Sequence, residues 1–162
     1  MKQKIKERKE LLGIIKDLKA KGKRIVFTNG CFDLLHIGHV RYLEEAKALG
    51  DVLVVGVNSD TSVRKLKGPK RPILPEEERV EILSGLECVD YVTLFHEIDP
   101  LELITSVRPD VLVKGGDWTK EQIVGRDEVE RSGGEVFIIS FVKRASTSNL
   151  IQTILKRYEK SA

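Results

Sequence analysis

Residues 24–49, with the sequence RIVFTNGCFDLLHIGHVRYLEEAKAL, decide the fold of this chain. The segment begins with an apolar run, residues 24–28, that is rich in β-branched and aromatic side chains, which predicts a buried strand. After the break at Asn29 and Gly30, apolar residues recur at helical spacing as far as position 49. The segment therefore predicts a strand, a tight loop and a helix, which is the building unit of a parallel α/β sheet.

Two histidines, His36 and His39, lie at the predicted start of this helix. Residues at positions i and i+3 share one helix face, so both imidazoles can point at one group above the helix N-terminus. That end offers unpaired N–H groups and no acidic residue in its first turn, and Gly38 lets a phosphate approach the backbone. Donors placed in this way neutralise the charge that develops during phosphoryl or nucleotidyl transfer. We therefore expect His36 and His39 to be catalytic.

Further strands and helices are predicted downstream. The run VLVVGV at residues 52–57 is apolar throughout, as is typical of a parallel strand covered on both faces. The other predicted strands span residues 91–95, 111–114 and 135–140. Helices are expected from Pro75 onward and at residues 100–107 and 119–131, and a last helix, starting at Ser146, is expected to face the core with Leu150, Ile151, Ile154 and Leu155. The pattern predicts an α/β fold: a Rossmann-like five-stranded parallel sheet with helices on both faces.

Length and composition predict one domain over residues 1–162, with an amphipathic helix at 1–20 and an α/β core at 24–158. The helix is expected to serve as a packing element or a dimer contact. The composition, 41% hydrophobic and 33% charged, is that of a soluble protein, and no apolar run reaches the ~18 residues of a membrane span. Without a signal-peptide pattern, and with two cysteines that form no disulfide framework, we expect a cytoplasmic protein with no membrane partner. A net charge of +3 is too modest to indicate a nucleic-acid partner.

Polar motifs follow the predicted strands, at the sheet edge where ligands of parallel α/β proteins bind. Asn58, Ser59 and Asp60 follow the second strand, where they can contact a ligand or form a turn or helix cap. Residues 64–71, RKLKGPKR, combine several cations with a Gly-Pro break and predict a mobile basic loop. Such a loop can close over the β- and γ-phosphates of a triphosphate, or it can be solvated surface.

Two later motifs lie at the same predicted edge. Residues 115–118, GGDW, follow the fourth strand; they can form a simple strand-to-helix turn, or bring backbone, a carboxylate and an indole wall to a ligand. Residues 146–149, STSN, start the last helix, where their hydroxyls can act as N-caps or bind phosphate oxygens.

Taken together, these motifs resemble the H-x-G-H signature and its flanking segments in the cytidylyltransferase-like nucleotidyltransferases. Members of that family move a nucleoside monophosphate from a triphosphate onto a phosphorylated acceptor. Within it, residues 20–155 are most similar to the heptose-1-phosphate adenylyltransferase module of ADP-heptose synthesis, through the ordered motifs TNGCFDLLH, VNSD, LKGPKRP, LVKGGDW and STSNLI. The resemblance implies a nucleotidylyl transferase fold and transfer of AMP from ATP to D-glycero-β-D-manno-heptose 1-phosphate, for lipopolysaccharide core synthesis. It also implies Mg²⁺ held mainly by the triphosphate rather than by assigned protein ligands, a homodimer, and a heptose-7-phosphate kinase as a functional partner.

The resemblance also implies roles for individual residues. Lys67 joins the two histidines as a catalytic residue, and Arg79 either braces the basic loop or reaches the ligand. The residues implied in nucleotide and phosphate binding are Thr28, Asn29, Gly30, Cys31, Phe32, Gly38, Lys65, Arg79, Ser146, Thr147 and Ser148. Those implied in acceptor binding are Asp33, Asn58, Asp60, Lys114, Gly116 and Asp117, with Trp118 left open. The chain departs from the family pattern in having Ala145 before the serine and no obvious counterpart of an arginine some members carry upstream, a place that Lys143 or Arg144 could take.

Other interpretations fit the sequence less well. The runner-up is a cytidylyltransferase acting on an alcohol phosphate such as glycerol 3-phosphate, and a nucleotide-binding module without turnover is a further alternative. Class I aminoacyl-tRNA synthetases share the H-I-G-H signature, but the chain has no K-M-S-K-S segment. A dinucleotide-binding enzyme is disfavoured because no G-x-G-x-x-G follows the first strand. A zinc site on His36 and His39 would need Cys31 and His96 as ligands, and these lack the usual ligand-pair spacing.

Overall fold

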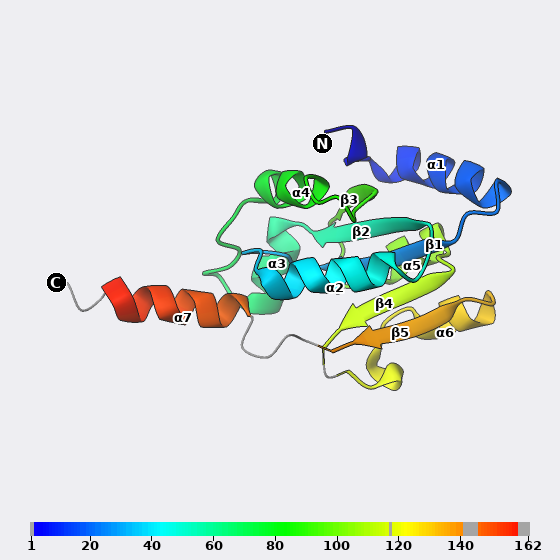
Figure 1. Ribbon diagram of the computed structural model, residues 1–162. Helices are drawn as coiled ribbons and strands as arrows, with labels where there is room; N and C mark the ends of the chain where they lie inside the picture. Colours follow the sequence, from blue (N-terminus) through cyan, green and yellow to red (C-terminus); the bar gives the residue numbers. More distant parts are fainter. Residues whose placement is uncertain (1, 117, 141–145, 159–162) are drawn as a thin grey trace.

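The computed structural model describes residues 2–116, 118–140 and 146–158. Their strands form one parallel sheet in the order β3-β2-β1-β4-β5, which confirms the predicted Rossmann-like architecture (Figure 1). The strands are β1 Ile25–Gly30, β2 Val52–Asn58, β3 Tyr91–Phe95, β4 Val111–Gly115 and β5 Glu135–Ile139. Because β2 and β4 lie on opposite sides of β1, the strand order reverses beside β1, and such a switch point is where open parallel sheets bind ligands.

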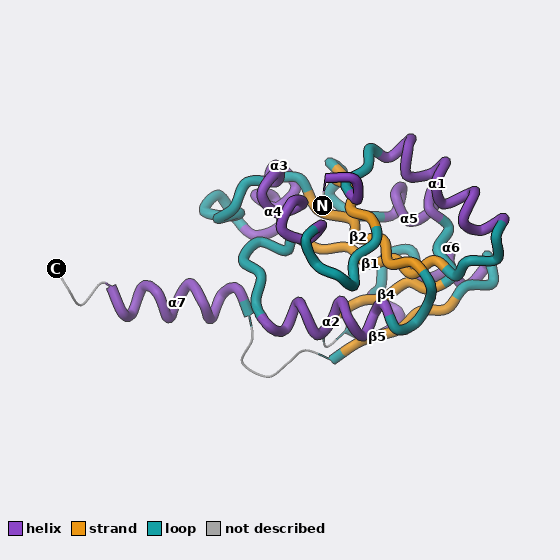
Figure 2. Tube along the Cα trace, turned by 45° about the horizontal axis from the view of Figure 1, so that its top comes forward, coloured by secondary structure: helices purple, strands orange, loops and turns teal. Residues whose placement is uncertain are grey.

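Helices cover both faces of the sheet. Those of the described residues are α1 Arg8–Ala20, α2 Ile37–Lys47, α3 Asp60–Lys67, α4 Glu76–Ser84, α5 Leu101–Val107, α6 Arg126–Arg131 and α7 Thr147–Tyr158, with short 3₁₀ turns η1 Lys2–Lys4 and η2 Lys120–Gln122. One hydrophobic core lies between the sheet and α1, α5 and α6, and the other lies between the sheet and α2 and α4. Figure 2 shows where the backbone of these helices runs relative to the sheet. Across the described residues, the search for a helix with the length and hydropathy to cross a bilayer finds none.

Successive side chains of the central strand β1 lie on alternate faces of the sheet. Ile25 and Phe27 point into the core under α1 and α5, whereas Val26 points into the core under α2. By the same alternation Asn29, near the carboxyl end of β1, lies on the α5 face and Thr28 lies on the α2 face. The end of β1 therefore offers polar groups to both sides of the sheet.

Several helical segments differ from the sequence prediction in their bounds. Residues 119–131 are not one helix: η2 and α6 are separated at Gly125, which has φ 85°, and a Cβ there would lie 2.8 Å from Ile104 Cδ1. The first half of the predicted basic loop is helical, because α3 runs through Lys67 and only Gly68, with φ 95°, ends it. The N-terminal helix starts at Arg8 rather than within the first residues of the predicted range 1–20.

The N-terminal segment packs on the domain. Leu11 and Ile15 of α1 are buried in the core under α5. Ahead of the helix, Ile5 pairs in parallel with Val92 of the edge strand β3, and the Lys6 N–H donates to the Val92 carbonyl at 2.9 Å. These contacts agree with a packing role.

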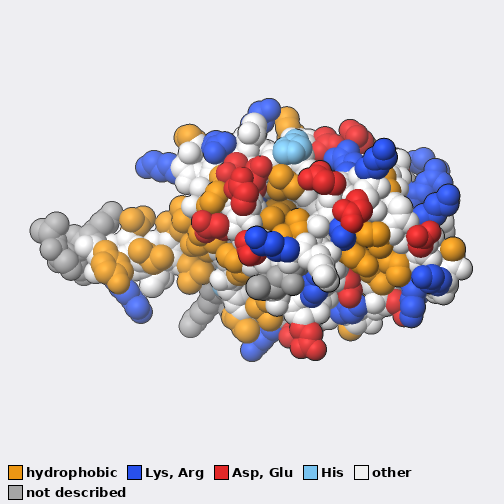
Figure 3. All heavy atoms as spheres, turned by 90° about the horizontal axis from the view of Figure 1, so that it is seen from above, with side chains coloured by type: hydrophobic (Ala, Val, Ile, Leu, Met, Phe, Trp, Pro, Cys, Tyr) orange, Lys and Arg blue, Asp and Glu red, His pale blue; other side chains and the backbone are white. Residues whose placement is uncertain are grey.

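The C-terminal helix contradicts the prediction that its apolar side faces the core. α7 projects from the body of the protein, and hydrophobic side chains gather along it (Figures 1 and 3). Leu150, Ile154 and Leu155 are 38%, 50% and 48% exposed, and Ile151 is half-buried. Helical periodicity shows that a helix has an apolar side, but it does not show what that side contacts.

Candidate active site

The loop after β1 is shaped around Phe32. This residue has φ 45°, a left-handed conformation that is uncommon outside glycine, and its side chain is buried. A Cβ on Gly30 would lie 3.0 Å from Phe32 Cε2, so the glycine leaves room for the ring. The ring of Phe32 also packs against the ring of His39, with 5.4 Å between the two ring centroids. The loop thereby positions one of the two predicted catalytic histidines.

His36 and His39 form a stacked pair at the N-terminus of α2. Their ring centroids are 3.8 Å apart and the ring planes are inclined by 22°. His36 occupies the N-cap position and Gly38, buried in the first turn, separates the rings along the chain. The Nδ1 atoms of both rings are buried and make no hydrogen bond within the described structure. Buried polar atoms are nearly always paired, so these two nitrogens lack a partner of the kind that a bound ligand or an ordered water molecule supplies.

Burial keeps this pair uncharged. Burial, together with the charge of His36, lowers the pKa of His39 to about 4, and burial also lowers the pKa of His36 below its usual value. At neutral pH each ring therefore has one N–H donor and one acceptor nitrogen. Two neutral N–H donors of this kind can stabilise negative charge on a phosphate without any change in their own protonation state.

Cations surround the thiol of Cys31 in the same loop. Burial raises the pKa of Cys31, while the charges of Lys67, Arg79 and Arg71 act in the opposite direction, which places these three cations close to the loop. Lys67 is exposed at the carboxyl end of α3, and Lys65 is exposed on the same helix. The predicted catalytic lysine is thus brought toward the loop that carries the histidines.

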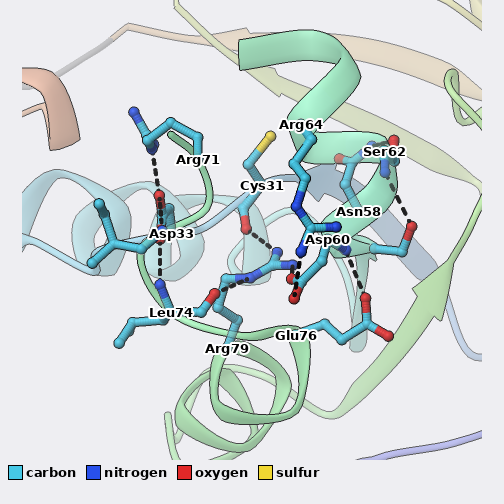
Figure 4. Close-up of polar contacts among 12 residues, drawn as sticks. Cys31, Asp33, Asn58, Asp60, Ser62, Arg64, Arg71, Leu74, Glu76 and Arg79 are labelled. Atoms are coloured by element: carbon cyan, nitrogen blue, oxygen red, sulfur yellow. Dashed lines mark hydrogen bonds and ion pairs between the residues drawn. The ribbon is translucent and has the colours of Figure 1, made fainter. Parts of the chain in front are cut away.

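The carboxylate of Asp33, expected to bind substrate, is bonded within the protein. Its side chain is fully buried, and its carboxylate accepts hydrogen bonds from the backbone N–H groups of Ile73 (2.8 Å) and Leu74 (3.0 Å). Arg71 Nε also donates to it at 2.5 Å (Figure 4). Asp33 therefore fastens the segment after the basic loop onto the histidine loop. Sequence reasoning placed Arg71 only within a run of cations and missed this contact.

Arg79 braces the loops rather than reaching outward. It is 1% exposed, and its guanidinium donates to the carbonyls of Leu74 (3.1 Å) and Cys31 (2.6 Å) and to the carboxylate of Asp60 (2.7 Å) (Figure 4). Of the two roles left open by the sequence, the structure supports the brace. The donors of Arg79 face the protein in this conformation, and its contact with the nucleotide stays a prediction.

The residues after β2 are also used internally. Asn58 is buried and its Nδ2 donates to Ser62 Oγ at 3.0 Å, and Ser59 caps α3 by accepting from the Ser62 N–H at 3.3 Å. The side chain of Asp60 pairs with Arg79, and the backbone N–H of Asp60 donates to the carboxylate of Glu76 at 2.6 Å. The helix-cap interpretation is therefore correct for Ser59. The acceptor contacts of Asn58 and Asp60 stay predictions.

The two side chains at the end of β1 have different environments. Thr28 is fully buried and shares a 2.6 Å hydrogen bond with the hydroxyl of Tyr42, and its contact with the nucleotide stays a prediction. Tyr42 in turn donates to the Val113 carbonyl at 3.1 Å, which ties α2 to β4. Asn29, on the other face, accepts a 2.5 Å hydrogen bond from Lys114 Nζ.

The start of α7 lies beside the histidine loop. Thr147 Oγ1 donates to the Leu34 carbonyl at 3.3 Å, so a residue more than a hundred positions away is brought to this site. Ser146 Oγ accepts from the Asn149 N–H at 3.1 Å as a helix cap, and Ser148 is exposed. After β4, the Gly116 N–H donates to the Ile139 carbonyl at 2.9 Å and Trp118 is 51% exposed. Asp117, Lys143 and Arg144 lie outside the described residues.

The parallel sheet, the histidine pair at the carboxyl end of its central strand and the cations around it define a nucleotidyltransferase-type domain. The model of the cytidylyltransferase-like family matches residues 27–157, and the chain belongs to that family.

Comparison with curated and solved proteins gives close relatives. The chain is 58% identical over 155 residues to bifunctional protein HldE of Pelobacter propionicus and 59% identical to that of Geobacter metallireducens. Each match covers 96% of this chain but 32% of the relative, so the chain spans about a third of their length. A crystal structure of the lipopolysaccharide core biosynthesis protein from Thermoplasma volcanium matches with a TM-score of 0.63 and 35% identity, over 76% of this chain and 100% of that one. Pantoate-β-alanine ligase from Francisella tularensis, at 17% identity and a TM-score of 0.60, shares the fold.

Proposed function

We propose that this domain is an adenylyltransferase that transfers AMP from ATP to D-glycero-β-D-manno-heptose 1-phosphate and produces ADP-heptose and pyrophosphate. The observation that carries the proposal is the neutral, stacked pair His36 and His39, with two buried and unpaired nitrogens at a helix N-terminus. A phosphate at this point would meet both imidazoles and the unpaired N–H groups of α2. The similarity to bifunctional protein HldE supports the choice of ATP and of a heptose phosphate.

The chemistry needs no nucleophile from the protein, because the acceptor phosphate is already an anion. One of its oxygens would form a bond to the α-phosphorus of ATP, and the bond from that phosphorus to the bridging oxygen of pyrophosphate would break. His36, His39 and the N–H groups of Cys31 and Phe32 would donate to the α-phosphate as charge develops there. Lys67 and the hydroxyls of residues 146–148 would stabilise the departing pyrophosphate.

Mg²⁺ is part of the proposal as a companion of the triphosphate. Within the described residues there is no group of three histidine, cysteine or carboxylate side chains suited to hold a metal ion. Asp33 and Asp60, the carboxylates beside the loops, are bonded to arginines. The triphosphate oxygens would therefore supply most ligands of the ion, which would neutralise phosphate charge.

The proposal also places the domain in lipopolysaccharide core synthesis in the cytoplasm. A kinase acting on heptose 7-phosphate would be its functional partner, and a homodimer would be its assembly.

A pyrophosphate-release assay tests the proposed activity. The domain is incubated with ATP and Mg²⁺ and with each member of a panel of sugar 1-phosphates that includes the heptose, in parallel with CTP and glycerol 3-phosphate. We expect release with ATP and the heptose 1-phosphate. Release only with CTP would replace the proposal by a cytidylyltransferase, and no release with any pair would favour a binding module without turnover.

The His39→Ala variant tests the role of the pair. Loss of one such donor typically lowers turnover about 10²- to 10³-fold, and we expect ATP affinity to change far less. His96→Ala is the matched control, because His96 is exposed and lies outside the pair. Equal losses of turnover and ATP affinity in His39→Ala would contradict the assignment.

A further inference from the structure

Lys114 lies at the sheet edge on the side away from the basic loop. The register pairs Thr28 of β1 with Val113 of β4, so Asn29 and Lys114 are neighbours one position further along. Alternation places both side chains on the α5 face, with Phe27 and Leu112 below them. The ammonium of Lys114 reaches back across the gap between the two strands and donates to Asn29 Oδ1 at 2.5 Å. This hydrogen bond spans the switch point of the sheet.

No anion in the described structure balances this ammonium. The side chain of Asn29 is neutral, the neighbour on β5 is Ile138, and Lys114 takes part in none of the ion pairs among the described residues. Among the titratable groups of the described residues, the Cys31 thiol influences the pKa of Lys114. Burial raises the pKa of this thiol and so keeps it protonated and uncharged. Burial lowers the pKa of Lys114 to about 8. A desolvated cation without a counter-charge is costly, and it becomes favourable when an anion binds beside it.

Topology indicates which anion this is. Lys67 and Arg71 follow β2, whereas Lys114 is the penultimate residue of β4, so the cations approach the end of β1 from opposite sides. In nucleotidyl transfer the attacking oxygen and the departing pyrophosphate lie roughly in line on opposite sides of the phosphorus. With the pyrophosphate toward Lys67, the attacking phosphate comes from the side of Lys114.

We propose that Lys114, held in place by Asn29, binds the phosphate of the acceptor and aims its oxygen at the α-phosphorus. The inference rests on the proposed function and makes it more specific: it is the phosphate group of the acceptor that this lysine recognises. Two of the three N–H donors of the ammonium remain for the phosphate after the bond to Asn29. Because a bound dianion favours the charged amine, acceptor binding is accompanied by proton uptake at Lys114.

The first test separates acceptor binding from ATP binding in the Lys114→Met variant, which keeps the chain length and removes the charge. We expect the acceptor KM to rise at least tenfold, while ATP affinity, measured by calorimetry, stays within about twofold. Lys114→Arg should recover part of the acceptor affinity, and Lys16→Met, on the exposed side of α1, is the matched control. An unchanged acceptor KM, or a loss confined to ATP affinity, would overturn the inference.

The second test is the pH dependence of the acceptor KM. With the Lys114 pKa at about 8, the charged fraction falls about tenfold between pH 7 and pH 9, so the wild-type KM rises about tenfold over this range. The same profile should be flat in Lys114→Met, a difference that a merely structural lysine would not produce. A tenfold rise retained in the variant would refute the assignment.

The two proposals fail in different ways. If the wild-type domain releases no pyrophosphate but heptose 1-phosphate, titrated directly by calorimetry, binds more weakly to Lys114→Met, the reaction is wrong and the phosphate subsite stands. If the wild-type domain turns over and Lys114→Met keeps its acceptor KM, the subsite is wrong and the reaction stands. If no sugar phosphate binds the wild-type domain, both fail.

Discussion

The buried state of His39 should make the stability of the domain depend on pH. The pKa of the folded His39 is about 4, against about 6.5 in an unfolded chain. Between these values the unfolded chain binds a proton that the folded protein does not, so lowering the pH favours unfolding. The penalty is absent above about pH 6.5, grows by about 1.4 kcal/mol per pH unit below it, and reaches about 2 kcal/mol at pH 5.

Urea unfolding at pH 7.5 and pH 5.0 measures this penalty in the wild-type domain and in His39→Asn. Both proteins lose stability in acid through their other groups, so the informative quantity is the difference between their losses. We expect the wild-type domain to lose about 2 kcal/mol more than the variant. His96→Asn is the control and should behave like the wild-type domain, since His96 is exposed. Equal losses in the wild-type domain and His39→Asn would refute the argument that burial keeps this ring uncharged.

Four substitutions test the packing that supports the site, each by its free energy of unfolding in urea. Arg79→Met removes the fully buried guanidinium that joins three segments and should cost about 3–5 kcal/mol; a cost below about 1 kcal/mol would contradict the bracing role. Leu11→Ala should cost about 2–5 kcal/mol because the side chain is completely buried. Leu155→Ala, on the projecting helix α7, should change the free energy of unfolding by no more than about 0.5 kcal/mol. Similar costs for the two variants would contradict the burial of α1 and the exposure of α7. Gly125→Ala should cost about 1–3 kcal/mol through its φ of 85° and the close approach to Ile104, and turnover per folded molecule should not change; a neutral effect on stability would argue against the break between η2 and α6.

The architecture was predictable because each buried strand is a short apolar run. The third strand was predicted with its observed bounds, and the first was predicted too short because Asn29 and Gly30 continue β1 although they look like a turn. The helix α3 was missed because the polar residues between Asp60 and Lys67 resemble a loop. Ser59 as its cap and Val63 as its buried residue were the available signals.

The roles of charged residues were harder to predict than their positions. The sequence brings Asp33 and Arg79 close to the loop of the histidines, but a carboxylate or guanidinium in such a place can face a ligand or a neighbouring segment. The partners of Asp33 are backbone N–H groups forty positions away, which no local pattern reveals. The histidine pair was predictable because its i, i+3 spacing joins the N-cap position of one helix to its first turn, so its geometry needs no long-range information.

The most direct test of the account is a crystal structure of the domain with Mg²⁺ and a non-hydrolysable ATP analogue. The account predicts that the α-phosphate lies within hydrogen-bond distance of the rings of both His36 and His39, above the N-terminus of α2. A complex in which the α-phosphate lies away from these rings, or in which the two rings coordinate a zinc ion instead, would contradict it.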